Sequence, residues 1–125
     1  MGRKGLVDRR KHIRYRAKEG AFAAVRPQYV KIGQIIDISR GGLAFRYTVT
    51  DSHENESHEL DIFLIGEVFH LSRVPFKIIS DLRIDEKSPP SPLQMWRCGV
   101  QFGELTQNQI QELEYFIRKH TVGEA

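Results

Sequence analysis

Short apolar or alternating segments, each ended by turn-forming residues, make up most of this chain. Alternation with a period of two is typical of strands, and clusters of Gly, Pro, Asn, Asp and Ser mark the turns between them. The pattern therefore predicts an all-β, mainly antiparallel fold. The expected strands cover residues 21–26, 29–36, 42–47, 59–65, 67–72, 74–80 and 95–102.

Irregular positions within this pattern add detail to the predicted strands. Gly33 interrupts the alternation of its segment, which indicates a bulge or a close approach of another backbone. The segments on either side of Arg73 are expected to be separate strands. Residues 51–57 and 85–92 are polar or rich in proline, so both are expected to be loops.

A single helix is expected after the last strand, at about residues 104–120. Thr106 is a suitable N-cap, and Gln109 three positions later completes a capping box. Four apolar residues at helical spacing form one stripe: Ile110, Leu113, Phe116 and Ile117. Because a helix of this length is marginal alone, we expect the stripe to pack across one end or the side of the strands. It would bind a partner protein only if the strands left it uncovered.

The length of 125 residues suits one domain with one core, and 40% apolar with 28% charged residues is ordinary for a globular protein. No apolar stretch is long enough to cross a bilayer, and the first residues lack the apolar run of a signal peptide. We therefore expect a cytoplasmic protein without membrane insertion. Cys98 is the only cysteine, so it has no internal disulfide partner and is expected to be a small core residue.

Positive charge is concentrated at the start of the chain. Residues 1–16 hold seven basic side chains and one acidic side chain, Asp8, so this segment carries +6 while the whole chain carries +3. Such a segment attracts compact polyanions, and the attraction weakens as salt rises. Binding of nucleic acid or of an anionic membrane surface is an alternative. Against it, Tyr15 is the segment's only aromatic residue, and no helix with a basic face follows.

Two motifs carry chemistry suited to a guanine-bearing phosphate ligand. The first, RRKHIR at residues 9–14, supplies guanidinium groups, which match phosphate oxygens or the O6/N7 edge of guanine with two hydrogen bonds. The second, DISRGG at residues 37–42, supplies a carboxylate acceptor for the guanine N1 and N2 donors, a hydroxyl, and glycines that allow close backbone approach. Either motif alone could be a charged tail or a tight turn, whereas their co-occurrence favours a ligand site.

The two motifs, in this order, resemble those of the PilZ domain family, which is defined by RxxxR, often RRxxxR, followed by [D/N]xSxxG. The matching residues are Arg9, Arg10, Arg14, Asp37, Ser39 and Gly42. The segment RCGVQF at residues 97–102 is similar to the glycine-x-phenylalanine strand that often closes the PilZ barrel. The resemblance implies that residues 17–125 form a six-stranded antiparallel β-barrel with a C-terminal helix. Residues 1–16 would precede it as a flexible basic arm.

The resemblance also implies binding of cyclic diguanylate (cyclic di-GMP), a bacterial second messenger, with no catalysis and no cofactor. The arm is expected to be mobile until the ligand clamps it against the DISRGG loop, and a downstream effector protein would read this change. Arg97 is included in the site, although its strand position leaves open whether it points toward the ligand. The predicted ligand-binding residues are Arg9, Arg10, Arg14, Asp37, Ser39, Gly41, Gly42 and Arg97.

Catalytic residues and metal ligands are not expected. His53 and His58 lie in an acidic segment that is better interpreted as a solvated turn, and His12 and His70 have no nearby cysteine or hydroxyl arranged as a nucleophile. Two alternatives to a receptor stay open: a binder of nucleic acid or anionic surfaces through the arm, and a PilZ-like interaction module that does not sense nucleotide. Nucleic acid is not the expected partner. The sequence also leaves open homodimer formation, the downstream process, and whether the ligand binds as one molecule or as a stacked pair.

Overall fold

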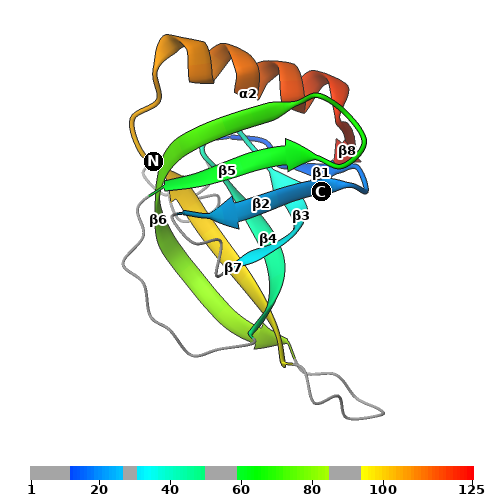
Figure 1. Cartoon of the computed structure of the whole chain (residues 1–125), viewed down its shortest axis with the longest axis vertical. Coiled ribbons are helices and arrows are strands. Elements are labelled where there is room, and N and C mark those ends of the chain that lie inside the picture. Colours follow the sequence, from blue (N-terminus) through cyan, green and yellow to red (C-terminus); the bar gives the residue numbers. More distant parts are fainter. Residues whose placement is uncertain (1–11, 27–30, 50–58, 85–93) are drawn as a thin grey trace, which may run out of the picture.

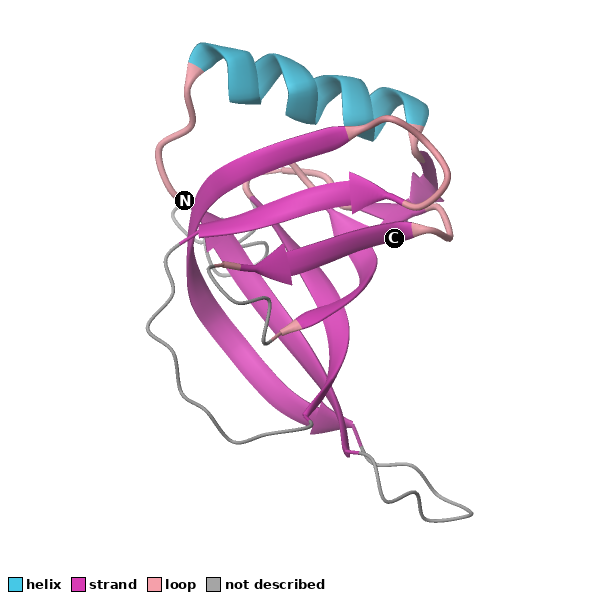
Figure 2. Cartoon of the chain, viewed as in Figure 1, coloured by secondary structure: helices cyan, strands magenta, loops and turns pink. Residues whose placement is uncertain are grey.

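A computed structural model of the chain describes residues 12–26, 31–49, 59–84 and 94–125. These residues form antiparallel strands and one helix, which lies across one end of the strands (Figures 1 and 2). The elements are β1 (Tyr15–Ala17), β2 (Ala21–Val25), β3 (Ile32–Ile38), β4 (Gly42–Val49), β5 (Glu59–Leu64), β6 (His70–Ile84), β7 (Gln94–Phe102), α2 (Gln107–Lys119) and β8 (Thr121–Glu124).

The strands close into a barrel. Neighbouring strands follow the order β2-β5-β6-β7-β4-β3, and β3 pairs back with β2, so these six strands form a closed ring. Every pairing is antiparallel. The predicted six-stranded antiparallel barrel with a C-terminal helix is confirmed.

Two short strands outside the ring were not predicted. The first half of β3 pairs with β2, whereas Asp37 and Ile38 in its second half pair with β1. Strand β8 then pairs with the other edge of β1. Tyr15 and Arg16, which were assigned to a mobile arm, are therefore part of the sheet. Residues 1–11 of that arm lie outside the described residues, as do the predicted loops at 51–57 and 85–92.

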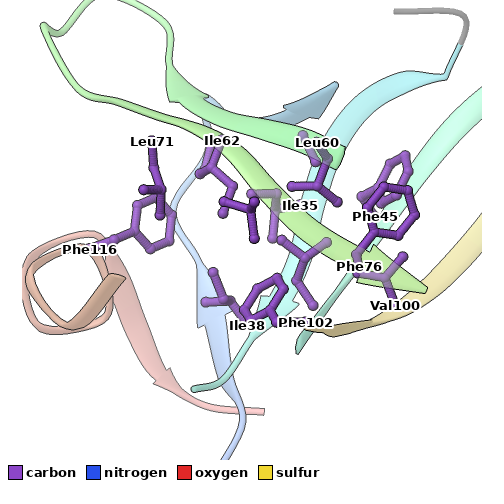
Figure 3. Close-up of a cluster of buried hydrophobic side chains, with 14 of the residues drawn as sticks. Ile35, Ile38, Phe45, Leu60, Ile62, Leu71, Phe76, Val100, Phe102 and Phe116 are labelled. Carbon is purple, nitrogen blue, oxygen red and sulfur yellow. The ribbon is translucent and has the colours of Figure 1, made fainter. Parts of the chain in front are cut away.

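The core is built from side chains that alternate inward along the barrel strands (Figure 3). Phe45, Ile62 and Val100 are fully buried, and Phe116 of α2 joins them from the helix side. Cys98 is also buried, as predicted. Most inward positions on the barrel strands are apolar, so most ionic side chains lie on the outer surface or near the ends of the barrel.

Strand β6 is one continuous strand, so the prediction of two strands separated at Arg73 is wrong. Arg73 does mark an irregularity, since its φ angle is +57° and the register between β5 and β6 shifts there. The buried carboxylate of Asp61 accepts a hydrogen bond from the Arg73 backbone N–H at 2.9 Å. The bulge therefore absorbs the irregular residue without ending the strand.

The predicted close backbone approach at Gly33 is confirmed. A Cβ atom at this position would lie 1.4 Å from the carbonyl oxygen of Arg46. Only glycine can occupy such a position, because any other residue would overlap the backbone of β4. The contact fixes β4 against β3 next to Arg46.

The helix was predicted at about 104–120 and occupies Gln107–Lys119. Its capping box is confirmed: the Thr106 hydroxyl accepts from the Gln109 N–H at 3.1 Å, and the Gln109 side-chain oxygen accepts from the Thr106 N–H at 3.0 Å. Leu113 and Phe116 are buried against the barrel, whereas Ile110 is 36% exposed. The apolar stripe thus packs on the barrel, as predicted. In the parts of the chain that the structure describes, no helix is long and apolar enough to span a membrane.

Candidate functional site

Asp37 lies on the outer surface of the barrel, near the end of β3. It is directly opposite Arg16 of β1 on one side and Ala44 of β4 on the other. The neighbours of Ala44 in the chain, Leu43 and Phe45, belong to the core, so Ala44 and Asp37 face outward. Asp37 is nevertheless only 6% exposed, because other side chains cover it.

Two arginines from distant parts of the chain contact the Asp37 carboxylate. Arg14, just before β1, places Nη1 2.6 Å from Oδ1, and Arg97 of β7 places Nη2 3.5 Å from Oδ2. Both contacts are hydrogen-bonded ion pairs. The structure thus brings together one residue from each motif, and it shows that Arg97 points toward Asp37.

The loop of the second motif is held by its own hydrogen bonds. The Ser39 N–H donates to the Gly42 carbonyl at 2.8 Å, and the Gly41 N–H donates to the Ser39 hydroxyl at 3.1 Å. The Ser39 hydroxyl also lies 3.4 Å from the Gly42 carbonyl oxygen, to which it donates. Ser39 is buried, and its side chain makes hydrogen bonds within the turn that follows β3.

The two glycines of this loop have different surroundings. A Cβ atom at Gly42 would lie 2.1 Å from the Val100 carbonyl oxygen, so this glycine is required where β4 meets β7. A Cβ atom at Gly41 would lie 2.8 Å from Cδ2 of His12. His12, which was not predicted as a site residue, therefore lies against the loop from the RRKHIR side. Its position inside the first motif was the available signal.

Arg9 and Arg10 lie outside the described residues. Among the residues that the structure does describe, no group of three or more His, Cys, Asp or Glu side chains is arranged to hold a metal ion. The thiol of Cys98 is not a suitable nucleophile, because burial and the nearby Asp81 carboxylate raise its pKa to about 12.

A hollow of about 300 Å³ lies beneath α2, lined by Arg40, Gly103, Leu105, Ile110, Leu113 and Glu114. Arg40 belongs to the second motif and pairs with Glu114 of α2 across 3.5 Å. The lining does not include Arg14, Asp37 or Arg97. The cluster of arginines around Asp37, rather than this hollow, carries the chemistry that the motifs predict.

Comparison with solved structures shows the same fold. MrkH, described as a c-di-GMP-dependent transcription regulatory factor, matches with a TM-score of 0.60 and 16% identity over 85% of this chain and 48% of MrkH. The complex of K. pneumonia MrkH with c-di-GMP matches with a TM-score of 0.65 and 20% identity over 87% of this chain and 51% of that chain. The chain thus spans about half the length of MrkH.

A third structure is matched over nearly its whole length. The PilZ domain of YcgR from Escherichia coli, with c-di-GMP, has a TM-score of 0.62 and 16% identity over 90% of this chain and 92% of that chain. No curated protein matches this chain by sequence. The family model for the PilZ domain, however, matches residues 8–119, which include both motifs, all barrel strands and the helix. This chain belongs to the PilZ domain family.

Proposed function

We propose that this chain is a non-enzymatic receptor for cyclic di-GMP. The observation that carries the proposal is the meeting of Arg14, from the first motif, with Asp37, from the second, on the outer surface of the barrel. Family membership supports it, as do the c-di-GMP complexes among the structures of similar fold.

The chemistry of the cluster suits a guanine with an attached phosphate. An ionised carboxylate has about four acceptor positions on its two oxygens. Arg14 and Arg97 approach one oxygen each, so Asp37 keeps acceptor capacity for the N1 and N2 donors of guanine. Each guanidinium has five donors, most of which stay available for phosphate oxygens or for the O6/N7 edge of guanine.

The remaining predicted residues take supporting roles in this proposal. Arg9 and Arg10 would add guanidinium groups from the segment before Arg14. Ser39 would hold the guanine together with Asp37, although its hydrogen bonds within the turn leave it only one lone pair for a ligand donor. Gly41 and Gly42 would shape the loop, which the close contacts at both positions support.

Signalling in this proposal depends on the N-terminal arm. We retain the hypothesis that the arm orders on ligand binding, but restrict it to the segment before Tyr15, because β1 is already paired with β3. A downstream effector protein would read the ordered arm. The proposal also places the receptor in the bacterial cytoplasm.

Calorimetric titration of the full chain with cyclic di-GMP tests the proposal, because it reports affinity and stoichiometry together. We expect saturable binding with one or two molecules per chain, and much weaker binding of cyclic di-AMP or of the linear guanine dinucleotide. Absence of saturable binding would overturn the receptor function. Affinity for DNA or RNA that rises with length and falls steeply with salt would instead support the basic-arm alternative.

A further inference from the structure

Arg46 of β4 lies on the same face of the barrel as Asp37. Residues directly opposite each other on antiparallel strands share a face, and so do residues two positions apart on one strand. Ala44 is opposite Asp37, Arg46 follows Ala44 by two positions, and Arg46 is directly opposite Arg97. The intervening Phe45 and the next residue, Tyr47, are buried in the core, so Arg46 projects outward, where it is exposed.

Arg46 and Arg97 form an opposed pair of like charges. Like charges at directly opposite positions destabilise a sheet unless another charge compensates them. Arg97 has the Asp37 carboxylate at 3.5 Å, but Arg46 makes no ion pair with any residue that the structure describes. The β4–β7 surface therefore carries an uncompensated positive charge next to the Asp37 cluster.

The backbone that carries Arg46 is held in place. A Cβ atom built on Gly33 would lie 1.4 Å from the carbonyl oxygen of Arg46, so the backbones of β3 and β4 are in direct contact at this point. A side chain that starts from a fixed backbone loses less freedom on binding a ligand than one on a loop. Arg46 is thus positioned, exposed and without an anionic partner among the described residues.

Between Asp37 and the arginine pair, the surface is formed by two of the smallest residues. Ala44 and Gly99 are directly opposite each other on β4 and β7. A Cβ atom at Gly99 would lie 2.6 Å from the Ser80 hydroxyl oxygen, so a larger residue there would require the Ser80 side chain to move. No long side chain starts from these two positions. The Arg97 side chain crosses this surface to reach Asp37, so a planar base held by Asp37 can stack on its planar guanidinium and extend toward Arg46.

We propose that Arg46, together with Arg97, forms a second phosphate-binding subsite on the outer surface of β4 and β7. The inference rests on the proposed function, because it requires a guanine held at Asp37. The ligand group is a phosphodiester of a cyclic dinucleotide. It comes either from the far side of the molecule held at Asp37 or from a second molecule stacked on the first. Neither source changes the residues that bind it.

Substitution of Arg46 in the full chain, followed by calorimetric titration with cyclic di-GMP, tests the subsite. Arg46→Ala should weaken binding by about tenfold to a hundredfold, as expected for loss of a charge-assisted hydrogen bond. An unchanged stoichiometry would assign the phosphate to the same molecule, and loss of one of two bound molecules would assign it to a second molecule. Both results support the subsite.

Arg83→Ala is the matched control, because Arg83 lies on the same sheet but on the opposite face. It is directly opposite Trp96, which is opposite the buried Tyr47. The control removes the same charge and should change the affinity by less than about twofold, as exposed charges away from a site do. If Arg83→Ala weakens binding as much as Arg46→Ala, general charge attraction accounts for the result and the subsite is wrong.

The subsite and the receptor function fail in different ways. If the parent chain does not bind cyclic di-GMP, the proposed function is overturned. If the parent binds and both Arg46→Ala and Arg46→Gln leave affinity and stoichiometry unchanged, only the subsite is overturned. The glutamine variant keeps much of the side-chain length, so it replaces Arg46→Ala should that protein not fold, and thermal unfolding of each variant checks the fold.

Discussion

Replacing Asp37 by alanine distinguishes recognition of guanine from simple charge attraction. Asp37 forms ion pairs with Arg14 and Arg97, both of which we expect to contact an anionic ligand. If the site attracted the ligand by charge alone, removal of this carboxylate would raise the net charge of the cluster from +1 to +2 and tighten binding. If Asp37 accepts hydrogen bonds from guanine, the same change would weaken binding. The two models therefore predict effects of opposite sign.

The effect on stability follows from the two ion pairs. The Arg14 pair is short, at 2.6 Å, and its side chains are 21% and 9% exposed, whereas the Arg97 contact is 3.5 Å and that arginine is 43% exposed. Exposed pairs contribute about 0–1 kcal/mol, and breaking a buried pair costs about 3–5 kcal/mol. The Arg14 pair lies between these limits. Asp37→Ala should therefore lower the free energy of unfolding by about 1–3 kcal/mol.

The effect on binding should be a loss of about tenfold or more, because a good contact to a base edge contributes about 1–3 kcal/mol of discrimination. Loss of the carboxylate also releases Arg14 from its fixed position, which adds to the cost of ordering it around the ligand. The gain from removing one negative charge near the ligand is smaller at moderate salt, because screening reduces it.

Urea unfolding measures the stability change, and calorimetric titration at moderate salt measures the affinity. Asp81→Ala is the control. The Asp81 carboxylate also pairs with a cation, Lys31, and it accepts a hydrogen bond from the Tyr47 hydroxyl, but it lies on the opposite face of the barrel wall from Asp37. The control should be destabilised with its affinity unchanged. Unchanged or tighter binding of cyclic di-GMP by folded Asp37→Ala would refute guanine recognition by Asp37.

Three further predictions concern single residues. Arg14→Ala should weaken binding of cyclic di-GMP by about thirty- to a hundredfold in a titration, and Arg14→Lys should not restore it, because an ammonium group cannot make the paired hydrogen bonds of a guanidinium. Gly42→Ala should lower the free energy of unfolding in urea by at least about 1–3 kcal/mol, since the added Cβ would lie 2.1 Å from the Val100 carbonyl oxygen; a stable variant would contradict the close contact. Cys98 should resist alkylation at pH 8 in the folded protein and react after unfolding, because its pKa is raised to about 12. The same shift should make stability fall as the pH rises from about 9 toward 12, since the unfolded thiol ionises first, and stability that rises over this range would argue against the buried thiol.

Local sequence patterns were sufficient to predict the elements whose pattern lies within one continuous segment. The helix was predicted because its capping box and its apolar stripe lie within one segment, and the structure confirms both. The close approach at Gly33 was predicted because an isolated glycine within a strand indicates a bulge or a neighbouring backbone in contact. Strand β6, in contrast, was wrongly predicted as two strands separated at Arg73. The bulge at Arg73 is stabilised by the carboxylate of Asp61, which belongs to another strand and leaves no sign in the local sequence.

The partners of the site residues depended on contacts that are distant in sequence. The motifs predicted which side chains belong to the site, but not that Arg14 pairs with Asp37 or that Arg97 points toward the same carboxylate. The direction of a strand side chain follows from register, and a shift of one residue would turn Arg97 to the other face. The position of Arg46 was not predicted for the same reason, since its pairing with Arg97 is what places it on the outer surface near Asp37.

Residue types and their local spacing thus identify the strand-rich fold, the terminal helix and the two motifs, because each of these signals acts within a few neighbouring residues. Strands β1 and β8 contain three and four residues, too few to show a period. Strand β1 forms because the second half of β3 is not paired with β2, and β8 then pairs with the other edge of β1. Direct pairing of β4 with β3 and with β7 lets Arg97 reach Asp37, and pairing of β1 with β3 brings Arg14 to the same carboxylate. That arrangement depends on register between distant strands, which no local pattern specifies.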